Sequence, residues 1–251
     1  MKGRPNLSET PAPHPKQVQK MFNNISQRYD FLNRLLSLRI DTLWRKRCIE
    51  SLLQRMRETG PILDLAAGTG DLSLALRKRT SLEHPIIAAD FSFQMLKILK
   101  EKKNPHDNIL IVTADGLSLP FKANTFSGIT IGFGIRNFTD RSSALKELHR
   151  VLKPGGTLAI LEFSIPRNVF FRSLYLFYFE KILPLIGGLF SDRSAYTYLP
   201  RSVRAFPPPE TFAHLIIDAG FQSVANFPLT GGIAHLYVGE KKVTDPSEKS
   251  P

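Results

Sequence analysis

The chain has 251 residues, of which 42% are hydrophobic, and these values suit one α/β domain with additional segments. The net charge of +12 favours an anionic partner, such as a nucleic acid, a membrane surface or an acidic protein. The single cysteine, Cys48, excludes an internal disulfide and a cysteine-based metal site, and it suits the reducing cytoplasm. No run of about 18 apolar residues is present to span a membrane.

The two ends of the chain are polar. Residues 1–15 contain four prolines and residues 241–251 are mostly charged or small, so we expect disorder in both. Residues 16–240 are predicted to form one domain that begins with helices over 16–59, where the apolar spacing is helical. On this pattern alone, the aromatic residues of these helices suit the core of an amphipathic helix pair packed on a sheet.

The stretch Ile62–Asp71 predicts a buried strand, a glycine turn and the start of a helix. Gly68 and Gly70 allow backbone conformations that other residues rarely adopt. Nucleotide-like cofactors bind at such a turn in doubly wound α/β proteins, but the dinucleotide fingerprint G-x-G-x-x-G is absent. Asp64 would repel a pyrophosphate and suits a cation. S-adenosylmethionine (SAM), which carries a sulfonium and no phosphate, is therefore the better supported cofactor.

Two further predicted strands lead to acidic residues. Ile86–Ala89 runs into Asp90, which lies about twenty residues after the glycine turn, the spacing at which a carboxylate meets ribose hydroxyls in related sites. Ile109–Val112 leads to Asp115, at the position that faces the adenine amino group in a SAM site. We therefore expect both carboxylates at one cofactor site. A helix over 94–102 is predicted between the two strands.

The fourth predicted strand, Gly128–Gly132, leads into a loop that contains Arg136 and Asn137. Ligands bind in the crevice at the carboxyl ends of parallel strands, so these side chains are well placed for function. A salt bridge in a surface loop is the alternative. The predicted elements that follow are a helix over 142–152, a closing loop over 153–156 and a fifth strand over 157–163.

Residues 165–206 form an insertion rich in aromatic side chains, with six basic residues against only Glu180 and Asp192. An apolar helix with a basic rim is typical of a lid over a hydrophobic substrate or of an interfacial membrane contact. A helical subdomain that completes the core is the alternative. Insertions at the carboxyl ends of strands commonly carry substrate selection, which favours the lid or the membrane contact.

The last part of the chain predicts a helix over 210–219, ended by Gly220, and two strands near 224–229 and 234–240. Only four residues join these strands, so they pair antiparallel. The sequence therefore predicts an α/β fold with a mostly parallel seven-stranded sheet, helices on both faces and an antiparallel C-terminal hairpin.

Three segments resemble the ubiquinone/menaquinone biosynthesis C-methyltransferases. Tyr29–Ser37, with Trp44 beyond it, resembles the first signature of that family, and Arg150–Ser164 resembles the second. Phe133–Asn137 is similar to the family's loop after the fourth strand. The order of elements resembles the Rossmann-like fold of class I SAM-dependent methyltransferases. The resemblance runs from residue 17 to residue 240, and it replaces the interpretation of the N-terminal aromatics as core residues.

The resemblance implies transfer of a methyl group from SAM to a ring carbon of a reduced, prenylated quinone. The expected substrate is 2-demethylmenaquinol, and the alternative is the methoxy-polyprenyl-benzoquinol of ubiquinone synthesis. Another small-molecule SAM methyltransferase is a weaker alternative. No metal is expected. The residues expected to bind SAM are Asp64, Gly68, Thr69, Gly70, Asp90, Asp115, Gly116 and Gly132.

Two positions depart from the family pattern. The first signature usually has a histidine three residues before the tryptophan, where this chain has Asp41. The family can place a serine near the cofactor after the fourth strand, where this chain has Gly132. One hydrogen bond to the cofactor is therefore expected to be missing.

A quinol ring carbon becomes a good nucleophile when the hydroxyl loses its proton, and a positioned base typically contributes about 10²–10⁴-fold. The site must also hold that carbon in line with the sulfonium methyl. We expect Arg136 and Asn137 to hold the quinol oxygen or an activating water. The arginine charge would favour the phenolate, although arginine itself stays protonated. Tyr196 and Asp41 are the reserve candidates.

Other function classes fit the sequence less well. DNA amino-methylating enzymes place an Asn/Asp-Pro-Pro-aromatic motif where this chain has Gly132–Ile135, and cytosine-C5 enzymes need a cysteine there. No nucleic acid partner is therefore expected. A non-catalytic SAM-binding scaffold conflicts with the intact second signature, and an O-methyltransferase usually needs a histidine base or a metal near the end of the fourth strand. We expect a cytoplasmic protein, peripheral on the inner face of a membrane, with a homodimer as one open assembly.

Overall fold

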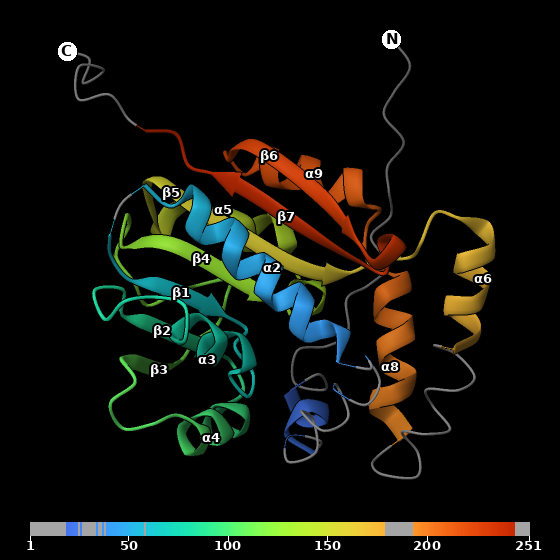
Figure 1. The fold of residues 1–251 in the computed structure, drawn as a ribbon, viewed down its shortest axis with the longest axis horizontal. Coiled ribbons are helices and arrows are strands. Elements are labelled where there is room, and N and C mark those ends of the chain that lie inside the picture. The colour runs from blue at the N-terminus through green and yellow to red at the C-terminus, as the bar shows by residue number, and fades with distance from the viewer. Residues whose placement is uncertain are drawn as a thin grey trace.

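The computed structural model describes residues 19–24, 26, 34, 37, 39–57, 59–178 and 193–243, without the side chains of 193–197. At its centre is a seven-stranded sheet in the order β3-β2-β1-β4-β5-β7-β6 (Figure 1). The first five strands of the chain, β1 to β5, run parallel, and β7 pairs antiparallel with β5 and β6. The strands are β1 (Ile62–Leu65), β2 (Ile86–Asp90), β3 (Ile109–Thr113), β4 (Phe126–Gly132), β5 (Leu152–Phe163), β6 (Gln222–Leu229) and β7 (Ala234–Glu240).

Helices cover both faces of this sheet. Helices α2, α3 and α4 pack on one face, α2 lying in front of the sheet in Figure 1, and α5 and α9 pack on the other. Helices α6 and α8 stand beside the sheet, at the right of the figure. The helices are α2 (Ile40–Arg55), α3 (Asp71–Arg77), α4 (Phe93–Lys102), η1 (Ile135–Asn137), α5 (Arg141–Val151), α6 (Val169–Phe177), α8 (Arg193–Arg204), α9 (Pro209–Asp218) and η3 (Thr230–Gly232).

The strands are apolar on both sides because each face of the sheet is covered. In β5, Leu158 and Ile160 pack in the cluster with α5 and α9, while Ala159 and Leu161 pack in the cluster with α2. This division follows from the alternation of side chains along a strand. The predicted α/β fold, its seven strands and its antiparallel hairpin are confirmed.

Cys48 lies in α2, in the core between that helix and the sheet, and is fully buried. Burial raises the pKa of its thiol to about 12, and the nearby Asp64 carboxylate acts in the same direction. The thiol is therefore protonated at neutral pH and packs as a small apolar group.

The structure differs from the expected elements at the start of β5. We predicted a loop over 153–156, but β5 already begins at Leu152, which pairs with Phe126. The next pair is Gly128 with Thr157, so the intervening residues form an irregularity. Their backbone is held by Lys241, whose N–H donates to the Gly156 carbonyl at 3.0 Å and whose carbonyl accepts from Gly155 at 2.8 Å.

Lys241, expected to begin a disordered tail, is fixed by its side chain. Its Nζ donates to Asn124 Oδ1 at 2.9 Å and to the carbonyls of His149 at 2.7 Å and Leu152 at 2.9 Å. The cation thus satisfies carbonyls at the end of α5, where the helix leaves them without intrahelical donors. The expectations for residues 1–15, 29–33, 179–192 and 244–251 lie outside the described residues.

Candidate functional site

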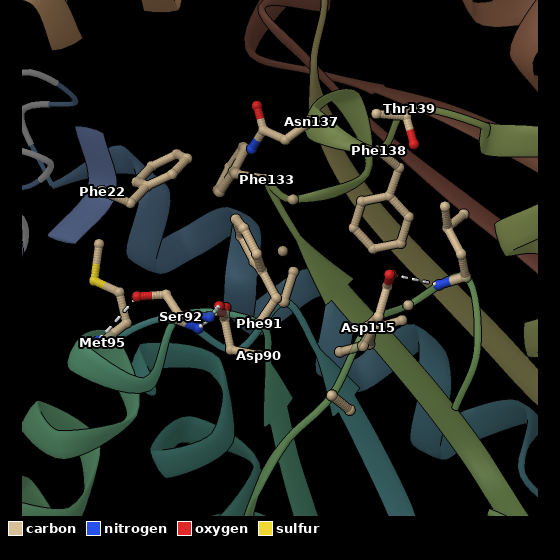
Figure 2. A pocket seen from close by; sticks show the side chains of 18 residues that line it. Phe22, Asp90, Phe91, Ser92, Met95, Asp115, Phe133, Asn137, Phe138 and Thr139 are labelled. Carbon is tan, nitrogen blue, oxygen red and sulfur yellow. Dashed lines mark hydrogen bonds between the residues drawn. The ribbon is translucent and has the colours of Figure 1, made fainter. Parts of the chain in front are cut away.

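A cavity lies at the carboxyl ends of β1, β2, β3 and β4 (Figure 2). The strand order reverses between β1 and β4, and such a reversal leaves a crevice in which α/β proteins bind ligands. Phe22, from the helical segment 19–24, adds a wall from outside the sheet. We call this the strand-end cavity.

The glycine turn after β1 borders the cavity through Ala66 and Gly68. Gly68 has a φ of +56°, and its N–H donates to Asp90 Oδ2 at 2.8 Å. A Cβ atom added to Gly68 would meet no protein atom within 4 Å. The backbone therefore meets open space, as the sequence predicted for close approach of a ligand.

Gly70 and Thr69 shape the turn and do not line the cavity. Gly70 has a φ of +84°, and a Cβ atom there would lie 2.1 Å from Leu99 Cδ1 of α4. The absence of a side chain at Gly70 therefore allows α4 to pack against the turn, and does not serve a ligand. Thr69 is buried, and its carbonyl accepts from Lys102 Nζ at 2.9 Å. Lys102 also pairs with Asp71 at 2.9 Å, so α4 is tied to the turn twice.

Asp90 ends β2 at the cavity wall and is nearly buried. Its Oδ1 accepts from the Ser92 N–H at 2.8 Å, and its Oδ2 accepts from Gly68. Burial raises the pKa of this carboxyl group, and the backbone donors oppose that rise. Ser92 in turn caps α4 by accepting from the Met95 N–H. The carboxylate is thus fixed at the cavity by the two loops that it joins.

Asp115 lies across the cavity from Asp90 (Figure 2). It is exposed, and its Oδ1 accepts from the Leu117 N–H at 2.9 Å. Gly116 is buried beside it, and an added Cβ atom would lie 2.5 Å from a ring carbon of Phe138. Apolar side chains complete the walls between the two carboxylates. They are Leu65, Phe91, Met95, Phe133 and Phe138.

The charge of the cavity selects the kind of ligand. Among the described residues, its lining holds two carboxylates and no lysine or arginine. A pyrophosphate would be repelled there, whereas a ligand with a positive centre and an aromatic ring meets carboxylates and apolar walls. The residues therefore fit SAM and do not fit a dinucleotide.

Asp64 does not reach the cavity. Its carboxylate is buried between β1, α3 and β4, where it accepts from the hydroxyls of Ser73 and, at 3.0 Å, of Thr130. Burial raises the pKa of Asp64 to about 6, although the two hydroxyl donors favour the charged form. We predicted this carboxylate beside a ligand, but Asp64 instead ties α3 and β4 to β1.

Asn137 lines the cavity from η1 and is bonded to the insertion. The Tyr198 hydroxyl of α8 donates to Asn137 Oδ1 at 2.8 Å. In Figure 2 the amide nitrogen of Asn137 lies on the side of Phe91 and the amide oxygen on the opposite side. The tyrosine thus fixes the orientation of the amide at the cavity wall.

Arg136 is buried behind the same loop and does not line the cavity. Its Nη1 pairs with Glu162 Oε1 of β5 at 2.8 Å and also donates to the Phe133 carbonyl. Its backbone N–H donates to Glu162 Oε2 at 3.1 Å. We predicted that Arg136 would hold a substrate oxygen. The structure places it elsewhere because a buried guanidinium needs a carboxylate partner, and Glu162 supplies one.

The remaining candidates occupy different places. Gly132 lines the cavity, and an added Cβ atom would lie 3.1 Å from Leu72 Cδ2 and 3.2 Å from Arg45 Nη1. Asp41 is buried in the first turn of α2, where it accepts from Ser37 Oγ at 2.6 Å and lies 3.4 Å from Arg45 Nε. Asp41 does not line the cavity. The side chain of Tyr196 lies outside the described residues.

Sequence reasoning missed several groups that the structure brings to the site, among them Phe91, Glu162 and Tyr198. Phe91 lines the cavity and follows Asp90 directly. Its place in the sequence, next to a residue that was expected to bind the cofactor, could have predicted this. Glu162 and Tyr198 carried no such signal, because they are 26 and 61 residues from the partners they bind, Arg136 and Asn137. Only the folded chain brings these side chains together.

The fit of the strand-end cavity to SAM agrees with the comparisons to known proteins. The chain matches the ubiE/COQ5 methyltransferase family over residues 11–241. This chain belongs to that family. The ubiquinone/menaquinone biosynthesis C-methyltransferase UbiE of Geotalea uraniireducens is 48% identical over 229 residues, which are 90% of this chain and 97% of that protein. The demethylmenaquinone methyltransferase of Thermus thermophilus is 45% identical over 223 residues, which are 88% and 100% of the two chains.

Solved structures support the fold of this UbiE/COQ5 family member. The [4+2]-cyclase SpnF matches with a TM-score of 0.67 and 17% identity, over 94% of this chain and all of that one. Phosphoethanolamine N-methyltransferase 2 of Haemonchus contortus, solved with SAM, matches with a TM-score of 0.55 and 14% identity, over 77% and 52%. At these identities the likeness shows the fold.

The protein is a SAM-dependent C-methyltransferase with SAM as its cofactor, as the sequence predicted. Among the described residues, no group of three or more histidine, cysteine or acidic side chains is placed to hold a metal. None of the helices in the described ranges is long and apolar enough to span a membrane.

Removal of the Ser73 hydroxyl tests whether the buried Asp64 is charged at neutral pH and stabilised by this donor. Asp64 has a pKa of about 6 in the folded chain and near 3.8 in the unfolded chain. Burial of its charge therefore lowers the free energy of unfolding progressively as the pH rises from 4 to 6, and by a constant amount above pH 6. Ser73→Ala removes a donor to the charged form and should lower the free energy of unfolding by about 1.5–3 kcal/mol near pH 8. Near pH 5 the loss should be smaller. Urea unfolding at both pH values measures it, with Thr130→Ser, which keeps its hydroxyl, as the control. Equal losses at the two pH values would contradict the assignment.

The two glycines of the turn should respond differently to alanine. Both have positive φ, so each alanine costs about 1–2 kcal/mol of stability. Gly70→Ala also meets Leu99, which adds about 1–3 kcal/mol. Gly68→Ala fills open space at the cavity wall and should weaken SAM binding about tenfold or more. Urea unfolding and titration calorimetry with SAM separate the two effects. Unchanged SAM affinity of Gly68→Ala would show that the turn does not contact the cofactor.

Proposed function

We propose that this enzyme methylates a ring carbon of a reduced, prenylated quinone, with 2-demethylmenaquinol as the substrate. The methoxy-polyprenyl-benzoquinol of ubiquinone synthesis is the alternative. The relatives, which are named for menaquinone and ubiquinone biosynthesis, support both substrates. In the structure, the observation that carries the proposal is the Asn137 amide, which lines the cavity and is oriented by Tyr198.

The cofactor half of the site is proposed to lie along the ends of β1 to β3. Asp90 would accept hydrogen bonds from the ribose hydroxyls, and its two backbone donors favour the charged form of its carboxyl group. Phe91 and Met95 would contact the adenine ring, and Asp115 would accept from its amino group. When bound, SAM supplies an electrophilic methyl group on a positively charged sulfur. Gly68 would leave room for the cofactor beside the turn.

Asn137 is proposed to hold the quinol oxygen. Its Oδ1 already accepts from Tyr198, so its amide N–H group is the part that meets the substrate. A donor to a developing phenolate stabilises the charged form and lowers the pKa of the quinol hydroxyl. The charge then spreads to the ring carbon that attacks the methyl group, while the hydroxyl proton and afterwards the proton of that ring carbon pass to water. Asn137 and Tyr198 thereby also orient the ring toward the cofactor.

Arg136 is proposed to act as a positioning residue, not as a ligand of the substrate. Glu162 binds both its guanidinium and its backbone N–H, and the guanidinium also binds the Phe133 carbonyl. These contacts fix the loop that carries Asn137. A change of about 1 Å in that loop is enough to cost a large part of the rate.

The insertion is proposed to cover the prenyl tail. Tyr175 of α6 packs with Val203 of α8 and with Phe22, whose ring lines the cavity. The insertion is therefore continuous with the cavity through apolar side chains. Because a prenyl tail partitions into a bilayer, we propose that the enzyme works at a membrane surface.

Methyl transfer from labelled SAM tests the proposed reaction. The purified chain should place label on a ring carbon of 2-demethylmenaquinol, in a bond stable to base, and the rate on the benzoquinol fixes the preferred substrate. A duplex DNA serves as the negative control. Label only in DNA, or only in a bond to oxygen, would show that the proposed reaction is wrong.

The Asn137 amide and its tyrosine are tested by two variants. Asn137→Ala removes the donor to the phenolate and should lower kcat about 10²–10³-fold, with little change in SAM affinity. Tyr198→Phe keeps the amide but frees its orientation, so it should lower kcat by less, about tenfold. Tyr178→Phe, assayed on a short-tailed quinol, is a matched control, because Tyr178 lies in the same insertion and does not line the cavity. If Asn137→Ala kept full turnover on either quinol, the proposed contact would be excluded.

A further inference from the structure

Helix α6 presents a row of large apolar side chains to solvent. Val169, Phe170, Leu174 and Phe177 are 56% to 82% exposed. At 3.6 residues per turn, these four positions fall on one side of the helix. We call them the α6 outer face. A set of this size on one helix face is unlike the scattered single apolar residues of an ordinary surface.

The opposite side of α6 is packed against the protein. Tyr175 is buried with Val203 of α8, and Phe163 and Ile233 pack against the same cluster. Phe171 lies over Gly231, where an added Cβ atom would be 2.7 Å from its ring. The helix is therefore docked in place by one face, so the α6 outer face is exposed while the helix is folded. In Figure 1, α6 stands at the margin of the molecule, beyond α8.

The segment that carries the α6 outer face is basic in its described residues. The described residues 165–178 and 193–206 contain Arg167, Arg172, Arg193, Arg201 and Arg204 and no acidic residue. Arg172, within α6 itself, is exposed, and Arg167 pairs with Glu210 of α9. A row of exposed phenylalanine, leucine and valine side chains in a segment that is rich in arginine is the pattern of a helix that lies in a membrane interface.

We propose that the α6 outer face docks this enzyme on an anionic lipid surface. The apolar side chains would enter the boundary between head groups and acyl chains, and each arginine of the segment that reaches the lipid surface would strengthen binding to anionic lipid about fivefold. A second copy of the chain is a poorer occupant, because it would bring two basic surfaces together on a protein of net charge +12.

The docked orientation places the catalytic site next to the bilayer. The inner face of α6 shares its apolar cluster with Phe22, and Phe22 lines the strand-end cavity. A quinol could therefore keep its tail in lipid while its ring enters the cavity past this cluster. This part of the inference rests on the proposed quinol substrate. The lipid contact itself rests on the exposed face and its charge.

Vesicle binding tests the docking surface without any quinol. The full-length chain should sediment with phosphatidylcholine vesicles that contain phosphatidylglycerol, and added salt should weaken this binding. The double variant Phe170→Ser and Leu174→Ser should bind at least about tenfold more weakly. The control is the double variant Leu82→Ser and Leu110→Ser, which removes two other exposed apolar side chains, outside α6, and should bind as the unchanged chain does.

A second readout separates this inference from the proposed reaction. The α6 variant should methylate a short-tailed, water-soluble quinol at the unchanged rate, and a long-tailed quinol in vesicles more slowly. If the unchanged chain methylates no quinol but binds vesicles through α6, the proposed substrate fails and the docking surface stands. If quinols are methylated while the α6 and control variants bind vesicles equally, the docking surface is wrong. Loss of a dimer in the α6 variant, with vesicle binding unchanged, would assign the face to a second copy.

Discussion

The site depends on one buried carboxylate. Asp90 binds the N–H groups of Gly68 and Ser92 with its two oxygens, and it thereby joins the turn after β1 to the start of α4. Ser92 carries the contact onward by capping that helix at Met95. Burial disfavours the charge of Asp90, and the backbone donors oppose that effect. Two loops that are separate in the sequence therefore hold one acceptor at the cavity wall, where a ligand with hydroxyl groups can reach it.

Two parts of the chain build the cavity and its support, the ends of the parallel strands and the insertion over 165–206. The ends of the parallel strands supply the turn and the two carboxylates that suit SAM. The insertion reaches the same space from outside the sheet through Tyr198, which binds Asn137 of the loop after β4. That loop is held from behind by the ion pair of Arg136 with Glu162. The wall of the cavity that Asn137 forms is thus positioned jointly by β5 and by the insertion.

Local patterns in the sequence were sufficient for the strands other than the start of β5, for the glycine turn and for the position of Asp90, because each depends on neighbours within a few residues or on a fixed spacing. They were insufficient for Asp64 and Arg136. Both are charged residues in the expected segments, but each points to a partner that only the folded sheet provides, Thr130 in one case and Glu162 in the other. The direction of a charged side chain follows from the cost of leaving it unpaired, and that cost depends on long-range packing.

The burial of Cys48 has a consequence for an enzyme that handles quinols. The oxidised form of such a substrate is an electrophile, and the unsubstituted ring carbon that accepts the methyl group is also a site of conjugate addition by thiolates. The thiolate is the reactive form of cysteine, and Cys48 is both inaccessible and protonated, with a pKa of about 12. Since the chain has no other cysteine, oxidised quinones find no thiol to alkylate on its surface. The protein is therefore suited to work among molecules that inactivate many enzymes through their thiols.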